Sequence, residues 1–155
     1  MTGTLRIDIA SVEALQSLAE RLGRATEPGD ALALVGPLGS GKTTFTQGLA
    51  RGLDIPDGRH VSSPTFALVN EHDGRHTLVH ADLYRIKSEV ELAELGLDES
   101  FDRAVVAIEW ADRFPGCLPV DHLRVSLLPT SETTRTVCLD YVGPRGQRLA
   151  QVLAK

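Results

Sequence analysis

The chain has 155 residues, of which 42% are hydrophobic and 24% are charged, and this predicts one globular domain over residues 1–155 with a core of its own. No apolar stretch approaches the roughly 20 residues that cross a membrane, and the N-terminus lacks the features of a signal peptide, so we expect a cytoplasmic protein with no membrane partner. The formal net charge of -5 and the scattered arginines argue against strong direct binding of nucleic acid, which needs a basic stripe.

The first part of the chain predicts a strand, a helix and a second strand. Residues 5–9 alternate between apolar and polar, which predicts a short edge strand. Ser11 is suited to cap a helix over about residues 11–25, whose apolar positions follow helical spacing. The continuous apolar run Ala31–Val35 is typical of a buried parallel strand.

A glycine-rich loop follows this run directly. The segment Gly36–Thr44 matches the phosphate-binding pattern G-x-x-x-x-G-K-[ST] without a mismatch. Its glycines permit the backbone N–H groups to surround an anion, and a helix that starts near Gly41 would point its positive end at the phosphates. A glycine-rich turn that carries a lysine by chance is the alternative. The residues expected to bind the nucleotide are Gly39, Ser40, Gly41, Lys42, Thr43 and Thr44.

Three side chains of this loop have distinct expected roles. Lys42 would reach the outer phosphates, and the Thr43 hydroxyl is placed to bind Mg²⁺. Thr44 would donate to an inner phosphate. The sequence therefore predicts a nucleoside triphosphate site that depends on a metal ion.

The rest of the chain predicts further strands and short helices. Asp73-Gly74 is a strong signal for a two-residue hairpin turn. The expected elements are a loop over 54–64, strands over 66–72 and 75–81, an acidic helix over 88–95, a central strand over 104–108, an antiparallel pair over 123–128 and 135–142, and a terminal helix over 147–154. The class is α/β, with a mixed sheet between helices.

Two carboxylates follow predicted strands and are candidates to complete the site. A phosphate-binding loop needs a carboxylate at the end of a neighbouring strand to hold the metal. Glu109 follows the more apolar strand and is the candidate for the metal, although aspartate is the usual residue there. Asp82 is the candidate to orient water or metal, with a turn or capping role as its alternative.

Other residues with potential chemistry have a simpler interpretation. His72, His76 and His80 have the spacing of a metal-binding helix face, but the predicted turn at 73–74 favours half-exposed strand histidines. Trp110 belongs either to the core or to the base pocket. Cys117 and Cys138 lack metal-binding spacing and are expected to be reduced thiols.

Several segments together resemble one family, the bacterial TsaE (YjeE) ATPases, which take part in making threonylcarbamoyladenosine on tRNA. The likeness spans about residues 30–125. The segments that carry it are the loop, SPTFALV at 63–69, HADLYR at 80–85, ELGL at 94–97 and IEW at 108–110. The segments at 63–69, 80–85 and 108–110 are far more specific than the loop.

The resemblance implies a P-loop NTP hydrolase fold with a mixed, mostly parallel sheet flanked by helices. It implies an ATPase that acts with TsaB and TsaD through ATP binding and slow hydrolysis, and that meets tRNA only through this complex. On this reading Thr43 and Glu109 hold Mg²⁺, Asp82 lies at the hydrolytic centre with Lys42, and Trp110 lies close to the base or the metal. Thr65 would sense the nucleotide.

The sequence departs from the family pattern at two positions. Pro37 stands where an acidic residue is common, and because proline has no N–H, one possible loop donor is missing. Ala111 stands where a proline usually follows the tryptophan.

Three other functions fit the loop. A small-molecule kinase would need an acceptor pocket and usually an arginine-bearing lid; no arginine-rich segment is present, although Arg85 and Arg135 could each reach a phosphate. A GTPase would carry N-K-x-D, which is absent. A nucleotide-dependent interaction module would use residues 54–64 and the acidic helix as partner surfaces.

Overall fold

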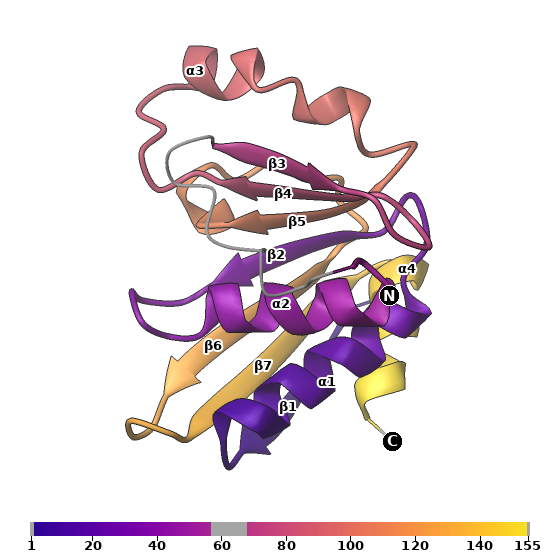
Figure 1. Cartoon of the computed structure of the whole chain (residues 1–155). Helices are drawn as coiled ribbons and strands as arrows, with labels where there is room; N and C mark the ends of the chain where they lie inside the picture. Colours follow the sequence, from indigo (N-terminus) through magenta and orange to yellow (C-terminus); the bar gives the residue numbers. More distant parts are fainter. Residues whose placement is uncertain (1, 57–67, 155) are drawn as a thin grey trace.

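One mixed sheet organises the molecule. The computed structural model describes residues 2–56 and 68–154, and in this part of the chain the strands form a seven-stranded sheet with the order β1-β7-β6-β2-β5-β4-β3 (Figure 1). The strands are β1 (Thr2–Ile9), β2 (Ala31–Val35), β3 (Val69–His72), β4 (Leu78–Asp82), β5 (Val105–Glu109), β6 (Leu123–Pro129) and β7 (Arg135–Val142). The four central strands β6, β2, β5 and β4 are parallel, and antiparallel pairs complete both edges. The α/β class, the mixed sheet and the edge position of the first strand are confirmed.

Helices cover the two faces of the sheet unequally. The helices α1 (Val12–Ala25), α2 (Lys42–Gly52) and α4 (Pro144–Leu153) contribute to one apolar core with the sheet. The short helix α3 (Glu89–Glu94) lies on the far side of β3, β4 and β5, where a second apolar cluster is buried (Figure 1). Among the described residues, none of the helices has the length and apolar character needed to cross a membrane.

The helices α1 and α2 approach each other closely because α2 contains Gly48. A methyl group at Gly48 would overlap the backbone carbonyl oxygen of Gln16 and lie 2.7 Å from Ala19 Cβ. Backbone atoms of α1 cannot rotate away as a flexible side chain would. The glycine therefore permits the short distance between α1 and the second half of α2.

Replacing Gly48 by alanine is expected to destabilise the protein by about 2 kcal/mol. Overpacking of a tight contact costs roughly 1–3 kcal/mol, and this outweighs the gain of about 1 kcal/mol or less in helix propensity. Thermal unfolding should show a melting temperature lowered by about 4–8 °C. Gln151→Ala, at an exposed position of α4, is the control for a helical substitution without crowding. An unchanged or raised melting temperature in Gly48→Ala would contradict the close contact.

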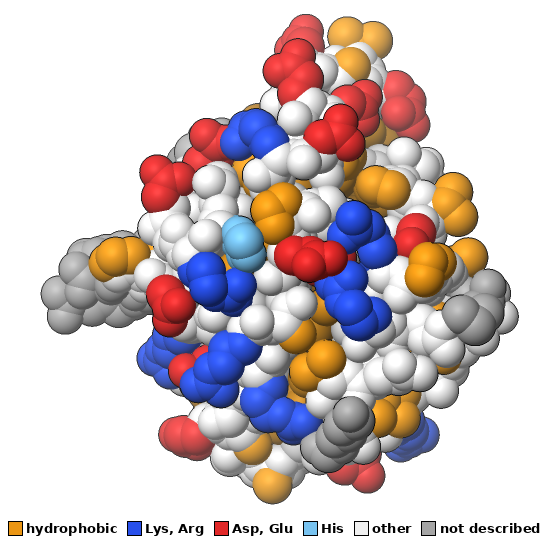
Figure 2. Space-filling model, turned by 90° about the vertical axis from the view of Figure 1, so that its right-hand side faces the viewer, with side chains coloured by type: hydrophobic (Ala, Val, Ile, Leu, Met, Phe, Trp, Pro, Cys, Tyr) orange, Lys and Arg blue, Asp and Glu red, His pale blue; other side chains and the backbone are white. Residues whose placement is uncertain are grey.

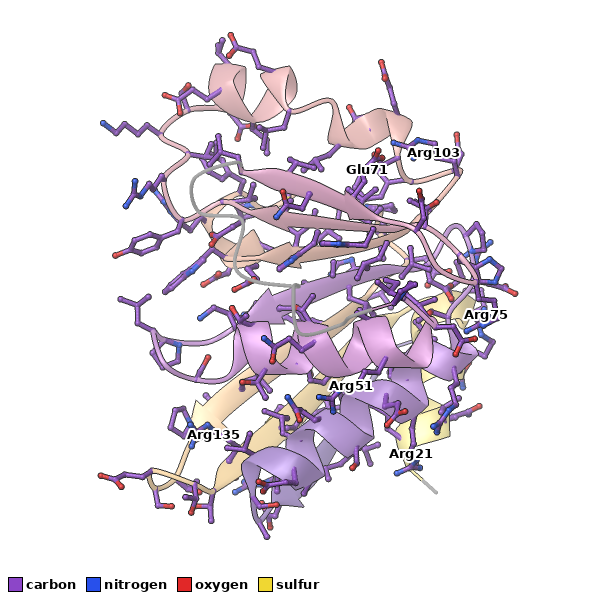
Figure 3. All side chains as sticks on the ribbon, viewed as in Figure 1. Arg21, Arg51, Glu71, Arg75, Arg103 and Arg135 are labelled. Carbon is purple, nitrogen blue, oxygen red and sulfur yellow. The ribbon has the colours of Figure 1, made fainter. Side chains whose placement is uncertain are left out.

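The connection between β3 and β4 differs from the predicted two-residue turn. The paired strands end at His72 and Leu78, so residues 73–77 form the connection. Its Arg75 turns away from the hairpin: the backbone N–H donates to Leu53 O at 2.7 Å, and the guanidinium donates to the carbonyls of Gly23 and Gly52 at 3.1 and 3.2 Å. Figure 3 shows Arg75 at the end of the molecule where α2 finishes. These contacts with the C-terminal ends of two helices hold the connection open.

The terminal helix begins earlier than predicted, at Pro144 rather than near residue 147. Proline is suited to the first helical position. The carboxylate of Asp121 caps the helix from a distance, because it accepts hydrogen bonds from the backbone N–H groups of Arg145 at 3.1 Å and Gly146 at 3.0 Å.

Arginines that are scattered in the sequence gather at the end of the molecule opposite the glycine-rich loop. Figure 2 views this end, where basic side chains lie close together with acidic ones between them. Arg145 and Arg148 both pair with the fully buried Asp30, directly before β2, and Arg75 lies 3.8 Å from Asp54. The ion pairs tie α4 and the hairpin connection to the sheet and the helices, so this group of arginines has a structural role.

Candidate nucleotide-binding site

The loop between β2 and α2 has the backbone of an anion site. Gly39 and Gly41 have φ values of 77° and 106°, which side-chain-bearing residues rarely adopt. Gly41 is the N-cap of α2 and offers no side-chain hydrogen bond to the first turn. The first N–H groups of α2 and the positive end of its dipole are therefore directed toward a ligand.

This loop borders a pocket of about 440 Å³. Its lining comes from the start of α1, the loop, the ends of β4 and β5, and the start of β7. The lining residues are Ser11, Val12, Leu15, Leu38, Gly39, Gly41, Lys42, Thr43, Thr44, Asp82, Tyr84, Glu109, Trp110 and Arg135. The structure thus brings together most of the residues predicted from the sequence.

Lys42 is folded against the loop. Its Nζ donates to the carbonyl oxygens of Gly36 at 2.6 Å and Pro37 at 2.9 Å, and lies 4.2 Å from the centroid of the Trp110 ring. Burial lowers the pKa of this ammonium, and the negative charges of Glu109 and Asp82 oppose that shift. The side chain is positioned so that phosphate oxygens could replace the two carbonyls as its partners.

The two predicted carboxylates lie side by side at one edge of the pocket. Asp82 ends β4 and Glu109 ends β5, and these residues are directly opposite in the parallel register. Both are buried, with 3% and 2% of their surfaces exposed. Asp82 also accepts a hydrogen bond from Tyr84 N at 2.9 Å, so the turn alternative holds for one of its oxygens.

The donor set of this edge fits Mg²⁺. The hydroxyl of Thr43 and the carboxylates of Asp82 and Glu109 line the same pocket, and Mg²⁺ prefers such hard oxygen donors. In the described part of the chain, no group of three or more His, Cys, Asp and Glu side chains is placed to hold a metal ion. Mg²⁺ is usually bound by one or two carboxylates together with substrate phosphates.

The prediction of half-exposed strand histidines is wrong for His80. Its side chain is fully buried in β4, and Nε2 lies 2.5 Å from Glu109 Oε2. His72 is partly buried in β3, and burial together with the proximity of His80 lowers its pKa. His76 lies in the connection between the strands.

Arg135, at the start of β7, holds the loop from the other side. Its Nε donates to Ser40 O at 2.9 Å and its NH2 to Gly39 O at 3.2 Å. Figure 3 shows Arg135 at the same end of the molecule as the loop that precedes α2. The guanidinium thereby fixes two loop carbonyls, which leaves the loop N–H groups directed into the pocket.

Replacing Arg135 by alanine is expected to weaken ATP binding about 10-fold, which corresponds to about 1.4 kcal/mol, because the loop loses two charge-assisted hydrogen bonds. Isothermal titration calorimetry with ATP would measure this change. Arg103→Ala is the matched control, since Arg103 forms an exposed ion pair with Glu71 on the edge strand β3 (Figure 3). Equal affinities in the two variants would show that Arg135 does not support the loop.

Three predicted site residues remain, and each has a different outcome. Trp110 lines the pocket beside Glu109 and packs against Tyr84, with ring centroids 4.9 Å apart and the ring planes tilted by 42°. Ser40 is buried under the loop and is absent from the described lining, so its contact with a nucleotide stays a prediction. Thr65 lies outside the described residues.

Sequence reasoning missed the contribution of α1 to the pocket. Val12 and Leu15 of α1 add apolar surface beside Leu38 of the loop, and no short pattern links residues 11–15 with the loop. The buried His80 had a weak signal, because it interrupts an otherwise apolar strand two residues before Asp82.

A loop of this pattern between a parallel strand and a helix, faced by carboxylates at the ends of neighbouring strands, defines a P-loop nucleotide-binding protein. A family model described as "Threonylcarbamoyl adenosine biosynthesis protein TsaE" matches residues 9–137. The chain belongs to this TsaE family.

Individual relatives agree with this assignment. A Bacillus subtilis protein named tRNA threonylcarbamoyladenosine biosynthesis protein TsaE is 39% identical over 145 residues, which cover 92% of this chain and 89% of the relative. A protein of the same name from Nostoc is 38% identical over 136 residues, covering 84% of this chain and 82% of the relative. The crystal structure of Bacillus subtilis YdiB superposes with a TM-score of 0.80 at 31% identity, covering 99% of this chain and 96% of YdiB.

Proposed function

We propose that this protein is a Mg²⁺-dependent ATPase that takes part in forming threonylcarbamoyladenosine on tRNA, in the cytoplasm and together with TsaB and TsaD. The observation that carries the ATPase assignment is the presence of Lys42, Thr43, Asp82 and Glu109 in the lining of one pocket at the start of α2. The names of the relatives support the pathway. The net charge of -5 favours contact with tRNA through the complex rather than by this chain alone.

The triphosphate is assigned to the loop. The N–H groups of Gly39, Gly41 and the first turn of α2 bind phosphate oxygens, with Thr44 as a further donor. Lys42 releases the loop carbonyls and pairs with the outer phosphates. The apolar side chains of Val12, Leu15 and Leu38 provide the surface for the base, and Trp110, next to Lys42 and Glu109, belongs to the phosphate end.

Glu109 and Asp82 have different roles in this proposal. Thr43 and Glu109 hold Mg²⁺, which when bound neutralises charge on the phosphates during transfer. Asp82, next to Glu109, orients the attacking water. No covalent intermediate on the protein is needed, because positioning and electrostatic stabilisation supply the catalysis of phosphoryl transfer.

Hydrolysis by the isolated chain is expected to be slow. Among the described residues, the pocket lining contains one arginine, Arg135. Its guanidinium already donates hydrogen bonds to the carbonyls of Ser40 and Gly39. An arginine that stabilises the transition state is worth about 10³–10⁵ in rate. A turnover near the ordinary kinase range of about 1–100 s⁻¹ in the purified chain would contradict this expectation.

The test compares ATP and GTP hydrolysis with Mg²⁺, in the presence and absence of TsaB and TsaD. Preference for ATP, weak turnover alone and a clear increase with both partners are the expected results. Fast turnover that appears only with a small-molecule acceptor, and that ignores these partners, would establish a kinase instead.

A further inference from the structure

The buried contact between His80 and Glu109 is not accounted for by binding of phosphate. His80 is outside the described pocket lining, yet the one hydrogen bond of its side chain in the described part of the chain joins it to a residue of that lining. We infer that His80 is a positioning residue, whose imidazole fixes the Glu109 carboxylate in the orientation that a divalent cation requires. The inference rests on the proposed function, because it assigns the metal to Glu109.

The strand register places the imidazole behind the carboxylate. His80 pairs with Ala107, and Asp82 pairs with Glu109, across the parallel strands β4 and β5. Because side chains alternate along a strand, His80, Asp82 and Glu109 project from the same face of the sheet. His80 lies two residues before the end of β4. It therefore contacts Glu109 from the interior of the protein, while the pocket lies beyond the end of the strand.

The hydrogen bond engages one oxygen of the carboxylate. His80 Nε2 lies 2.5 Å from Glu109 Oε2, which leaves Oε1 as the oxygen for the pocket. The two side chains are 0% and 3% exposed, so water does not compete for this contact. A buried carboxylate held in this way loses rotational freedom and keeps one oxygen directed at its ligand. Hydrogen-bond partners behind metal-binding side chains commonly have this effect.

The second ring nitrogen helps to assign the tautomer. Within the described residues, His80 Nδ1 is buried and lacks a hydrogen-bond partner. With the proton on Nε2, the ring donates to Glu109 and leaves a bare acceptor at Nδ1 rather than an unpaired N–H donor. The polar function of this buried histidine is thus directed at a single atom, Glu109 Oε2.

The test compares His80→Gln with His80→Asn. Both variants keep a polar amide, but the glutamine NH₂ reaches the place of Nε2 whereas the shorter asparagine NH₂ reaches only the place of Nδ1. Binding of Mn²⁺ to the protein with ADP is followed by electron paramagnetic resonance, and ADP binding in EDTA is measured separately. His72→Leu, on the neighbouring strand β3, is the control for substitution of a histidine on this face.

We expect His80→Asn to weaken Mn²⁺ binding at least about 10-fold, the lower range for loss of an outer partner, while His80→Gln stays close to the wild type. ADP affinity in EDTA should remain within about twofold in both variants, since His80 does not contact the phosphates. Equal Mn²⁺ affinity in His80→Asn and the wild type would overturn the inference, as would equal losses in the asparagine and glutamine variants. A wild-type protein that binds neither ADP nor Mn²⁺ with ADP would instead refute the proposed function.

Discussion

Lys42→Ala is expected to reduce ATP affinity at least about 100-fold, equivalent to about 2.7 kcal/mol. Charge-assisted hydrogen bonds are worth roughly 1.5–3 kcal/mol each, and Lys42 provides the mobile cation of the phosphate site. In the structure its Nζ is held by the carbonyls of Gly36 and Pro37, so the ammonium is already beside the loop before a ligand enters. Isothermal titration calorimetry with ATP would measure the loss.

Lys87→Ala is the matched control for this variant. It removes the same charge from an exposed position next to α3, away from the described pocket lining. The control should bind ATP as the wild type does, and both variants should unfold at temperatures close to that of the wild type. An ATP affinity of Lys42→Ala within about threefold of the control would exclude the loop as the phosphate site.

Glu109→Gln is expected to lower Mg²⁺-dependent ATP turnover about 100-fold and to leave ATP binding in EDTA within about threefold of the wild type. Glutamine keeps the shape and still accepts a hydrogen bond from His80, but it lacks the negative charge that holds a cation. A metal at a transferring phosphoryl group contributes several kcal/mol to transition-state stabilisation, and a 100-fold loss corresponds to about 2.7 kcal/mol. Turnover and equilibrium binding measured on the same preparation would separate the two effects.

Asp112→Asn is the control for the change in charge. Asp112 also acts on Lys42 electrostatically, but it is exposed and does not belong to the described lining of the pocket beside the loop. Its variant should retain turnover. Parallel losses of metal-free ATP binding and turnover in Glu109→Gln would count against a metal role and favour a direct contact with the nucleotide.

Most of the central fold could be predicted because local signals agree there. The apolar runs before the loop and before Glu109 are the strands β2 and β5, and Ser11 caps α1 by accepting from Ala14 N at 3.0 Å. These features depend on residues that are close in the chain. The loop, its helix and the two carboxylates were found for the same reason.

The errors arise where distant residues decide the structure. The Asp73-Gly74 turn was overridden by the contacts of Arg75 with the ends of α1 and α2. The start of α4 depends on a carboxylate at Asp121, more than twenty residues upstream. The burial of His80 depends on its neighbour Glu109 in another strand, and spacing along the chain does not reveal such a pair.

The stacking of Lys42 on Trp110 also gives the molecule an intrinsic optical probe. Trp110 is the single tryptophan of the sequence, and the Lys42 ammonium lies 4.2 Å from its ring centroid. An ammonium group this close to an indole ring interacts electrostatically with its π electrons. Movement of Lys42 toward an arriving phosphate would change the emission of this ring, so rapid-mixing fluorescence could time nucleotide arrival and departure without any attached dye.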